Sequence, residues 1–233
     1  MLLIIHIPKT AGTSLRQSLL EQYGQSRLAL DYEGQSEVTS SVVNQYLYQG
    51  EASLGVKKLV DELRATGYQA IIGHYALSKY GEFFRADEVI TLVREPLVRS
   101  CSEYLHKSSN GAFAGTFSEF MQKPVNQNIQ ARMLNGYKKE MFIGVTERYS
   151  DSLEVINKLF GLQVNLKIMN LGERGGGERF HKDLSQDITD HFYEINQRDV
   201  ELYQESSRRL NELIPASKKK MGVLRRLLSR NPM

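Results

Sequence analysis

A loop near the start of the chain combines a lysine, several hydroxyl side chains and a glycine. In chain order its residues are Pro8, Lys9, Thr10, Ala11, Gly12, Thr13 and Ser14. Consecutive backbone N–H groups in such a loop can point at one anion, Gly12 allows close approach, and the start of a following helix adds partial positive charge. The hydroxyls of Thr13 and Ser14 can donate to the same oxygens. The loop therefore predicts a phosphate site, with a plain strand-to-helix turn as the alternative.

The position of Lys9 separates this loop from the phosphate loop of nucleotide hydrolases. In the motif GxxxxGK[ST] the lysine follows the second glycine and directly precedes the hydroxyl residue. Lys9 instead precedes Gly12. Magnesium-assisted transfer from ATP is therefore not the first expectation. A nucleotide-dependent kinase on a related scaffold remains an alternative, which magnesium dependence would distinguish.

A second polar block follows another apolar run. Arg94 comes directly after residues 89–93, Pro96 stands where a helix would begin, and Ser102 lies about two helical turns beyond the arginine. A guanidinium presents a planar fork of donors that matches phosphate oxygens. Arg94 and Ser102 are therefore expected to hold one phosphate, unless Arg94 forms a surface salt bridge with Glu95.

Short apolar runs alternate with helical patterns along the chain. Strands are predicted at residues 2–7, 70–72, 89–93, 141–145 and 164–169. Helices are predicted at residues 15–23, 56–63, 97–106, 129–134 and 153–160, and throughout the C-terminal region. This alternation indicates an α/β fold, a P-loop-like three-layer domain with a central, mainly parallel sheet flanked by helices. Ligands of such folds bind at the carboxyl ends of the strands.

The loop and the arginine block together resemble motifs of the sulfotransferase superfamily, in particular the carbohydrate sulfotransferases that include heparan sulfate 2-O-sulfotransferase. In that family a loop similar to residues 8–14 holds the 5′-phosphosulfate of 3′-phosphoadenosine 5′-phosphosulfate. A block similar to Arg94 and Ser102, with the same spacing, holds its 3′-phosphate. The resemblance therefore implies that these residues bind this sulfuryl donor, and it extends through residues 128–134, 142–148 and 199–203.

His74 follows the predicted strand at residues 70–72 and resembles the catalytic histidine of the family. A neutral imidazole can accept a hydroxyl proton near neutral pH, so we expect His74 to be the general base. A purely structural histidine is the alternative. Lys9 is expected to stabilise the leaving phosphate, and His6 to pack or hydrogen-bond beneath the loop. Residues 28–54 match no family motif. Within them, residues 30–50 have weak periodicity and no firm predicted structure, and we interpret them as a lid or insertion on the acceptor side.

Two basic segments carry weaker signals. Residues 174–179 contain three consecutive glycines between charged side chains, and we interpret them as an exposed flexible turn, with a flap that closes on the donor as the alternative. The final segment mixes apolar residues with Lys218, Lys219, Lys220, Arg225, Arg226 and Arg230. It could rest on an anionic membrane surface as an amphipathic helix or remain a solvated terminus.

Composition limits the remaining classes of protein. The chain has 233 residues and a net charge of +3, and its body outside the basic tail is mildly acidic, which argues against a general nucleic-acid-binding surface. Cys101 is the only cysteine, so an intrachain disulfide is impossible, and no motif indicates a metal site. We expect one domain at residues 1–215, a basic tail at 216–233, and a cytoplasmic location because no signal peptide or membrane span is apparent.

The expected function is thus sulfuryl transfer to a hydroxyl acceptor, which the resemblance suggests is a saccharide. The residues do not identify that acceptor or the oligomeric state. The alternatives are the kinase named above and a non-catalytic module that binds a nucleotide or a glycan.

Overall fold

The structure is a computed structural model that describes residues 1–34, 36–49, 55–165 and 171–214, the side chains of residues 171–175 excepted. The basic tail at 216–233 lies outside the described residues. Five strands form one sheet in the order β2-β3-β1-β4-β5, and every pair of neighbours runs parallel. The strands are β1 (Leu2–Ile5), β2 (Leu28–Asp31), β3 (Ala70–Gly73), β4 (Val89–Val93) and β5 (Phe142–Val145).

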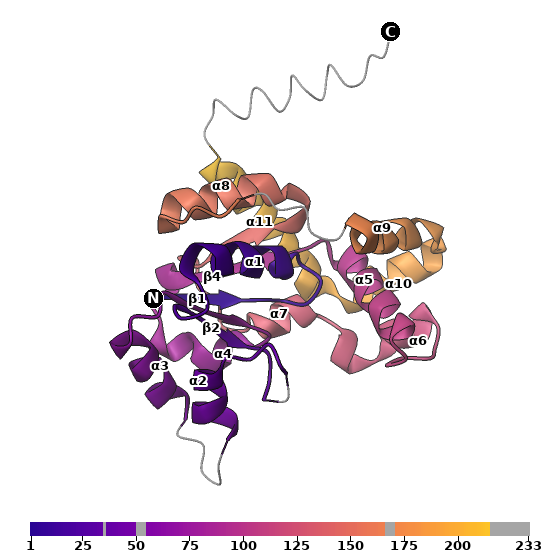
Figure 1. The fold of residues 1–233 in the computed structure, drawn as a ribbon. Helices are drawn as coiled ribbons and strands as arrows, with labels where there is room; N and C mark the ends of the chain where they lie inside the picture. The colour runs from indigo at the N-terminus through magenta and orange to yellow at the C-terminus, as the bar shows by residue number, and fades with distance from the viewer. Residues whose placement is uncertain (35, 50–54, 166–170, 215–233) are drawn as a thin grey trace.

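Helices cover both faces of this sheet. They are α1 (Gly12–Tyr23), α2 (Ser41–Val43), α3 (Val56–Ala65), α4 (Leu77–Tyr80), α5 (Pro96–Ser109), α6 (Phe117–Gln122), α7 (Ile129–Met133), α8 (Tyr149–Phe160), α9 (Leu171–Phe180), α10 (Gln186–Ile195) and α11 (Gln197–Leu213). A π-helical turn spans Asn44–Tyr48, and 3₁₀ turns span Gly81–Phe83, Ala86–Glu88, Pro124–Asn126, Thr146–Arg148 and His181–Asp183. Figure 1 shows α1 and α8 above the sheet, and α3 and α4 below it. The fold is therefore the expected three-layer α/β arrangement.

The sheet forms because its strands are almost wholly apolar. All residues of β3, β4 and β5 are buried, as a strand covered on both faces requires. A second cluster of buried side chains, including Leu97, Phe117 and Phe192, joins α5, α6 and α10 beside the sheet. Figure 1 shows α5, α6, α9 and α10 gathered at one end of the molecule.

Most elements predicted from the sequence are confirmed, with two corrections. The strand β2 lies inside residues 28–54, where the sequence indicated no firm structure. It has only four residues, and its free edge is completed by Ser40, whose side chain accepts from Leu30 N at 2.9 Å and whose N–H donates to Leu30 O at 2.9 Å. The strand predicted at 164–169 is wrong for residues 164 and 165, which belong to no strand, and residues 166–169 lie outside the described part.

Candidate functional site

The predicted phosphate loop connects β1 to α1 and has an unusual backbone. Lys9 and Ala11 both adopt left-handed conformations, with φ of 69° and 66°, although neither is glycine. Such conformations cost about 1 kcal/mol or more per residue and concentrate at functional sites. Ala11 caps α1 without any side-chain hydrogen bond. The helix start thus keeps its positive end available for an anion.

Gly12 is needed because His6 occupies the space where a side chain would be. A Cβ atom on Gly12 would lie 1.9 Å from His6 Cδ2. The imidazole of His6 is only 6% exposed, and its Nδ1 lies 2.8 Å from the hydroxyl oxygen of Tyr32. The expectation that His6 packs and hydrogen-bonds beneath the loop is confirmed.

The parallel register places three rings in one row at the carboxyl end of the sheet. Gly73 pairs with Ile5 on one side and with Asp31 on the other, so the next residues along the three strands are neighbours. These residues are His6, Tyr32 and His74. The centroid of the His74 ring lies 4.4 Å from that of His6 and 4.6 Å from that of Tyr32. His74 therefore stands between two rings, and its own side chain is exposed.

Burial and charge keep both histidines neutral. Burial, reinforced by the nearby His74 and Arg16, lowers the pKa of His6 to about 3. The pKa of His74 is also lowered, first because the side chains packed around the ring shield it partly from water, while the negative charge of Glu103 raises it and the positive charge of Arg16 lowers it. A neutral, exposed imidazole at this edge can accept a proton from a hydroxyl group.

Arg16 is a site residue that sequence analysis missed. It lies on α1 one turn beyond Gly12, and its guanidinium carbon is 5.0 Å from the centroid of the Tyr32 ring. Its Nε is buried and has no hydrogen-bond partner within the described part of the chain. The only sequence signal was its spacing of one helical turn from the loop, which brings an α1 side chain back to the same edge.

Arg94 meets the phosphate loop directly. It is 5% exposed, and its Nη1 donates to the carbonyl oxygen of Lys9 at 3.3 Å. Its side chain also lies 3.5 Å from a carboxylate oxygen of Glu178 and 3.8 Å from one of Glu147. The surface salt bridge to Glu95 considered above is wrong, because Arg94 is buried and Glu95 instead caps α5 by accepting from Val98 N at 2.7 Å.

Two further contacts fix the backbone around Arg94. The side-chain amide of Gln130 accepts from Arg94 N at 2.8 Å and donates to Arg94 O at 2.9 Å. The Thr146 hydroxyl lies within hydrogen-bonding distance of both Thr10 O, at 3.0 Å, and Val93 O, at 2.9 Å. Thr146, which directly follows β5, therefore links the loop after β1 to the end of β4, and Gln130 links Arg94 to α7.

Residues 174–179 are not the flexible turn that the three glycines suggested. They belong to α9, which packs along α5. A Cβ on Gly177 would lie 3.0 Å from Ser102 N and 3.1 Å from Val98 O, so the missing side chain lets the two helices approach closely. Tertiary packing thus overrides the poor helix propensity of glycine. Ser102 is 7% exposed, with α9 against it, and Arg94 lies two residues before the start of its helix.

A buried cluster beside the row of rings is fully satisfied internally. The Asp31 carboxylate, 1% exposed, accepts from Tyr48 at 2.8 Å, Lys79 at 2.6 Å and Tyr80 at 2.6 Å. These contacts join the end of β2 to the π-helical turn and to α4. The cluster therefore anchors the segment that carries Tyr32.

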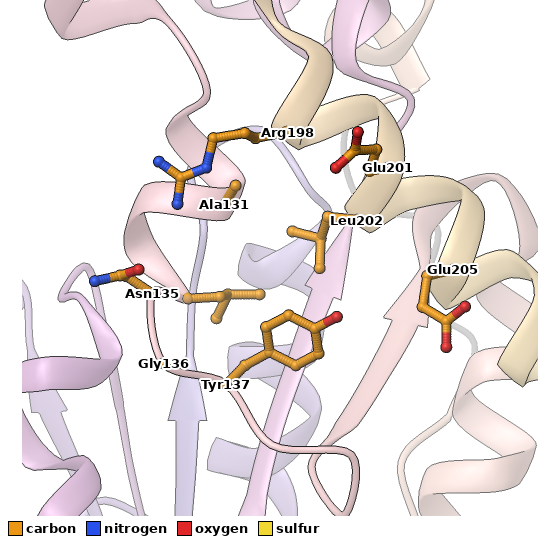
Figure 2. A pocket seen from close by; sticks show the side chains of 9 residues that line it. Ala131, Asn135, Gly136, Tyr137, Arg198, Glu201, Leu202 and Glu205 are labelled. Carbon is orange, nitrogen blue, oxygen red and sulfur yellow. The ribbon is translucent and has the colours of Figure 1, made fainter.

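Other features of the described residues lie apart from this edge. Figure 2 shows a pocket of about 390 Å³ where Arg198 and Glu201 of α11 project above Asn135 and Tyr137 of the loop that leads into β5. It contains neither Lys9 nor His74. Burial raises the pKa of the Cys101 thiol to about 12, so this cysteine is unreactive.

The described ranges contain neither a metal-binding cluster nor a membrane-spanning helix. No three His, Cys, Asp or Glu side chains there are grouped as a metal site would require. None of the helices in this part of the chain has the length and apolar character needed to cross a bilayer.

Comparison with solved structures gives a distant likeness, whereas two comparisons with known sequences give none. No protein-family model matches the chain, and no curated protein matches it. Among solved structures, it is similar to mouse sulfotransferase SULT7A1 complexed with PAP, at a TM-score of 0.41 and 14% sequence identity. The match covers 80% of this chain and 68% of the mouse chain. A likeness this distant transfers no residue role to this chain.

Proposed function

We propose that the chain transfers a sulfuryl group from 3′-phosphoadenosine 5′-phosphosulfate to a hydroxyl acceptor. The observation that carries this proposal is the meeting of three groups at one sheet edge. His6 contacts both Gly12 of the phosphate loop and His74, and Arg94 donates to the backbone of Lys9. This arrangement supports a site in which an anion loop, a second phosphate-binding side chain and a neutral base act together.

In the proposed complex the chain holds both ends of the donor. The backbone and hydroxyl groups of residues 10–14 bind the 5′-phosphate, and Arg94 and Ser102 bind the 3′-phosphate. The donor supplies a sulfuryl group on a phosphate leaving group. For Arg94 to bind its phosphate, that phosphate must replace the carboxylate of Glu178, which now lies 3.5 Å away.

The reaction itself needs one base and one cation. His74 takes the proton of the acceptor hydroxyl as its oxygen forms a bond to sulfur in line with the breaking bond between sulfur and the phosphate oxygen. Lys9 neutralises the negative charge that grows on that phosphate oxygen. The products are the sulfate ester and 3′-phosphoadenosine 5′-phosphate, with the proton on His74 before its release to water.

The acceptor is proposed to be a saccharide because the loop and arginine motifs resemble those of carbohydrate sulfotransferases. The described part of residues 28–54 supplies Tyr32 beside the base, and also Tyr48, which contacts Asp31 at the end of β2 and is 39% exposed. Exposed aromatic rings suit the apolar faces of sugars. These residues are therefore placed on the acceptor side.

Titration calorimetry and two variants test the proposal. Wild-type protein should bind 3′-phosphoadenosine 5′-phosphate in preference to ATP and need no magnesium. His74→Ala should lower kcat by about 10²- to 10⁴-fold while leaving binding of that nucleotide unchanged. Lys9→Ala should lower kcat by about 10²-fold or more. His191→Ala and Lys57→Ala, both on exposed helix faces, are the matched controls.

Three outcomes would contradict the proposal. Preference for ATP with magnesium dependence would indicate the kinase. Binding of 3′-phosphoadenosine 5′-phosphate without transfer to any hydroxyl would indicate a non-catalytic module. Loss of nucleotide binding in His74→Ala would place this histidine in the donor site.

A further inference from the structure

The ring of His74 needs an external restraint to act as a base. The last side-chain torsion of histidine has broad, roughly two-fold minima, so the rotamer alone does not fix where the ring nitrogens point. An error of about 1 Å in the position of a reacting group can cost about 10²-fold in rate. Because His74 is exposed, its restraint must come from the neighbours on its two sides.

Those neighbours are linked to each other. Tyr32 and His6 contact His74 from the flanking strands, at ring distances of 4.6 and 4.4 Å, and the Tyr32 hydroxyl oxygen lies 2.8 Å from His6 Nδ1. Both contacts with His74 are edge-type, with interplanar angles of 66° and 64°. The hydrogen bond between the flanking rings therefore closes a frame around the base.

We propose that Tyr32 and His6 are positioning residues, which hold the His74 imidazole in the orientation that accepts the acceptor proton. This inference rests on the proposed sulfuryl transfer. Neither residue contacts the reacting atoms in this scheme, and both act through His74. The hydrogen bond between them is the part of the frame that a single-atom change can remove.

Each side of the frame has its own support. The backbone N–H of Tyr32 donates to the Thr39 hydroxyl at 2.9 Å, and the guanidinium of Arg16 lies over the Tyr32 ring. On the other side, the His6 ring fills the space above Gly12 of the phosphate loop. His6 therefore connects the donor loop to the base. A frame with both sides supported can restrain a ring that faces solvent.

The experiment compares Tyr32→Phe, His6→Phe and the double variant. Both single changes keep an aromatic ring beside His74 and remove the same hydrogen bond. We expect each to lower kcat about tenfold, and the double variant to be no worse than either single one because both changes delete one interaction. The dissociation constant for 3′-phosphoadenosine 5′-phosphate should stay unchanged in Tyr32→Phe. Carbon relaxation of the His74 ring should report greater mobility in all three variants.

Tyr104→Phe is the matched control. The Tyr104 hydroxyl donates to Gly115 O at 3.1 Å, and this hydrogen bond lies away from the carboxyl edge of the sheet. It should change neither kcat nor the relaxation of His74. If Tyr32→Phe has the same kcat and the same His74 relaxation as the wild type, the inference is overturned. The hydrogen bond would then contribute to folding stability alone. Strictly additive losses in the double variant would also overturn it. If the wild-type chain transfers no sulfuryl group, the proposed function fails, while ring relaxation still decides whether the frame exists.

Discussion

The pKa of His74 reflects the removal of water from its ring and two nearby charges of opposite sign. Burial and the positive charge of Arg16 lower its pKa, and the negative charge of Glu103 on α5 raises it. The neutral rings of His6 and Tyr32 are the other groups that face it. A general base must be unprotonated, so the lowered pKa would let His74, in its proposed role, act on the acid side of neutrality.

Removing the two charges separately should move the pH profile in opposite directions. Arg16→Ala removes a positive charge, which makes the imidazolium easier to form, so the acid limb of kcat/KM should move to higher pH. Glu103→Gln removes a negative charge that favours the imidazolium, so the limb should move to lower pH. The pH dependence of kcat/KM and an NMR titration of His74 measure both shifts. Lys57→Ala is the control, and shifts of equal sign in the two variants would refute this electrostatic account.

At the scale of elements, the helix α9 is positioned by a glycine rather than by a side chain. Gly177 lets its backbone approach Val98 and Ser102 of α5, and the next residue, Glu178, then reaches Arg94. Close packing without a side chain explains the glycine at position 177 of this helix. The contact therefore links the position of α9 to the proposed donor site.

Two neighbouring glycines in α9 allow a matched test. A Cβ on Gly176 would meet only Leu105 Cδ1, at 3.5 Å, so Gly176→Ala should stabilise the fold by up to about 1 kcal/mol through helix propensity. A Cβ on Gly177 would press on the backbone of α5, so Gly177→Ala should destabilise it by about 1–3 kcal/mol. Urea unfolding measures both values. Equal effects of the two substitutions would show that α9 does not pack on α5 in this way.

At the scale of the whole molecule, the buried His6 makes global stability depend on pH. Its pKa is 6.5 in the unfolded chain and about 3 in the folded one, so between these values the unfolded state binds a proton that the folded state does not. Stability must therefore fall as the pH drops through this window. The loss attributable to His6 is up to about 5 kcal/mol at the lower limit.

Urea unfolding at a series of pH values tests this linkage. Wild-type protein should lose stability steadily from about pH 6.5 towards pH 4. His6→Asn is expected to be less stable at pH 7, because the ring packing is lost, but to show a flatter decline with acid. His191→Asn, on an exposed face of α10, should keep the wild-type slope. A slope unchanged by His6→Asn would mean that other groups cause the acid sensitivity.

The sequence indicated the elements more completely than the site. Apolar runs located β1, β3, β4 and β5, because a buried parallel strand has a strong local signal. The sequence also located the loop with Lys9 and the candidate base His74. It missed Tyr32 and Arg16, since their roles depend on the strand register and on the return of α1 over the sheet. It misjudged residues 174–179 because the propensity of glycine is local, whereas the packing of α9 on α5 is not.

Because the strand register aligns His6, Tyr32 and His74, insertions should be tolerated in some loops but not within the three strands that precede these residues. Side chains alternate between the two faces of a strand, so one residue inserted into β1, β2 or β3 would turn that strand's member of the row to the opposite face. The loops at the other edge, such as residues 66–69 before β3, carry no member of the row and can lengthen at small cost. Relatives of this chain should therefore vary in length at one edge of the sheet while the spacing within these three strands stays fixed.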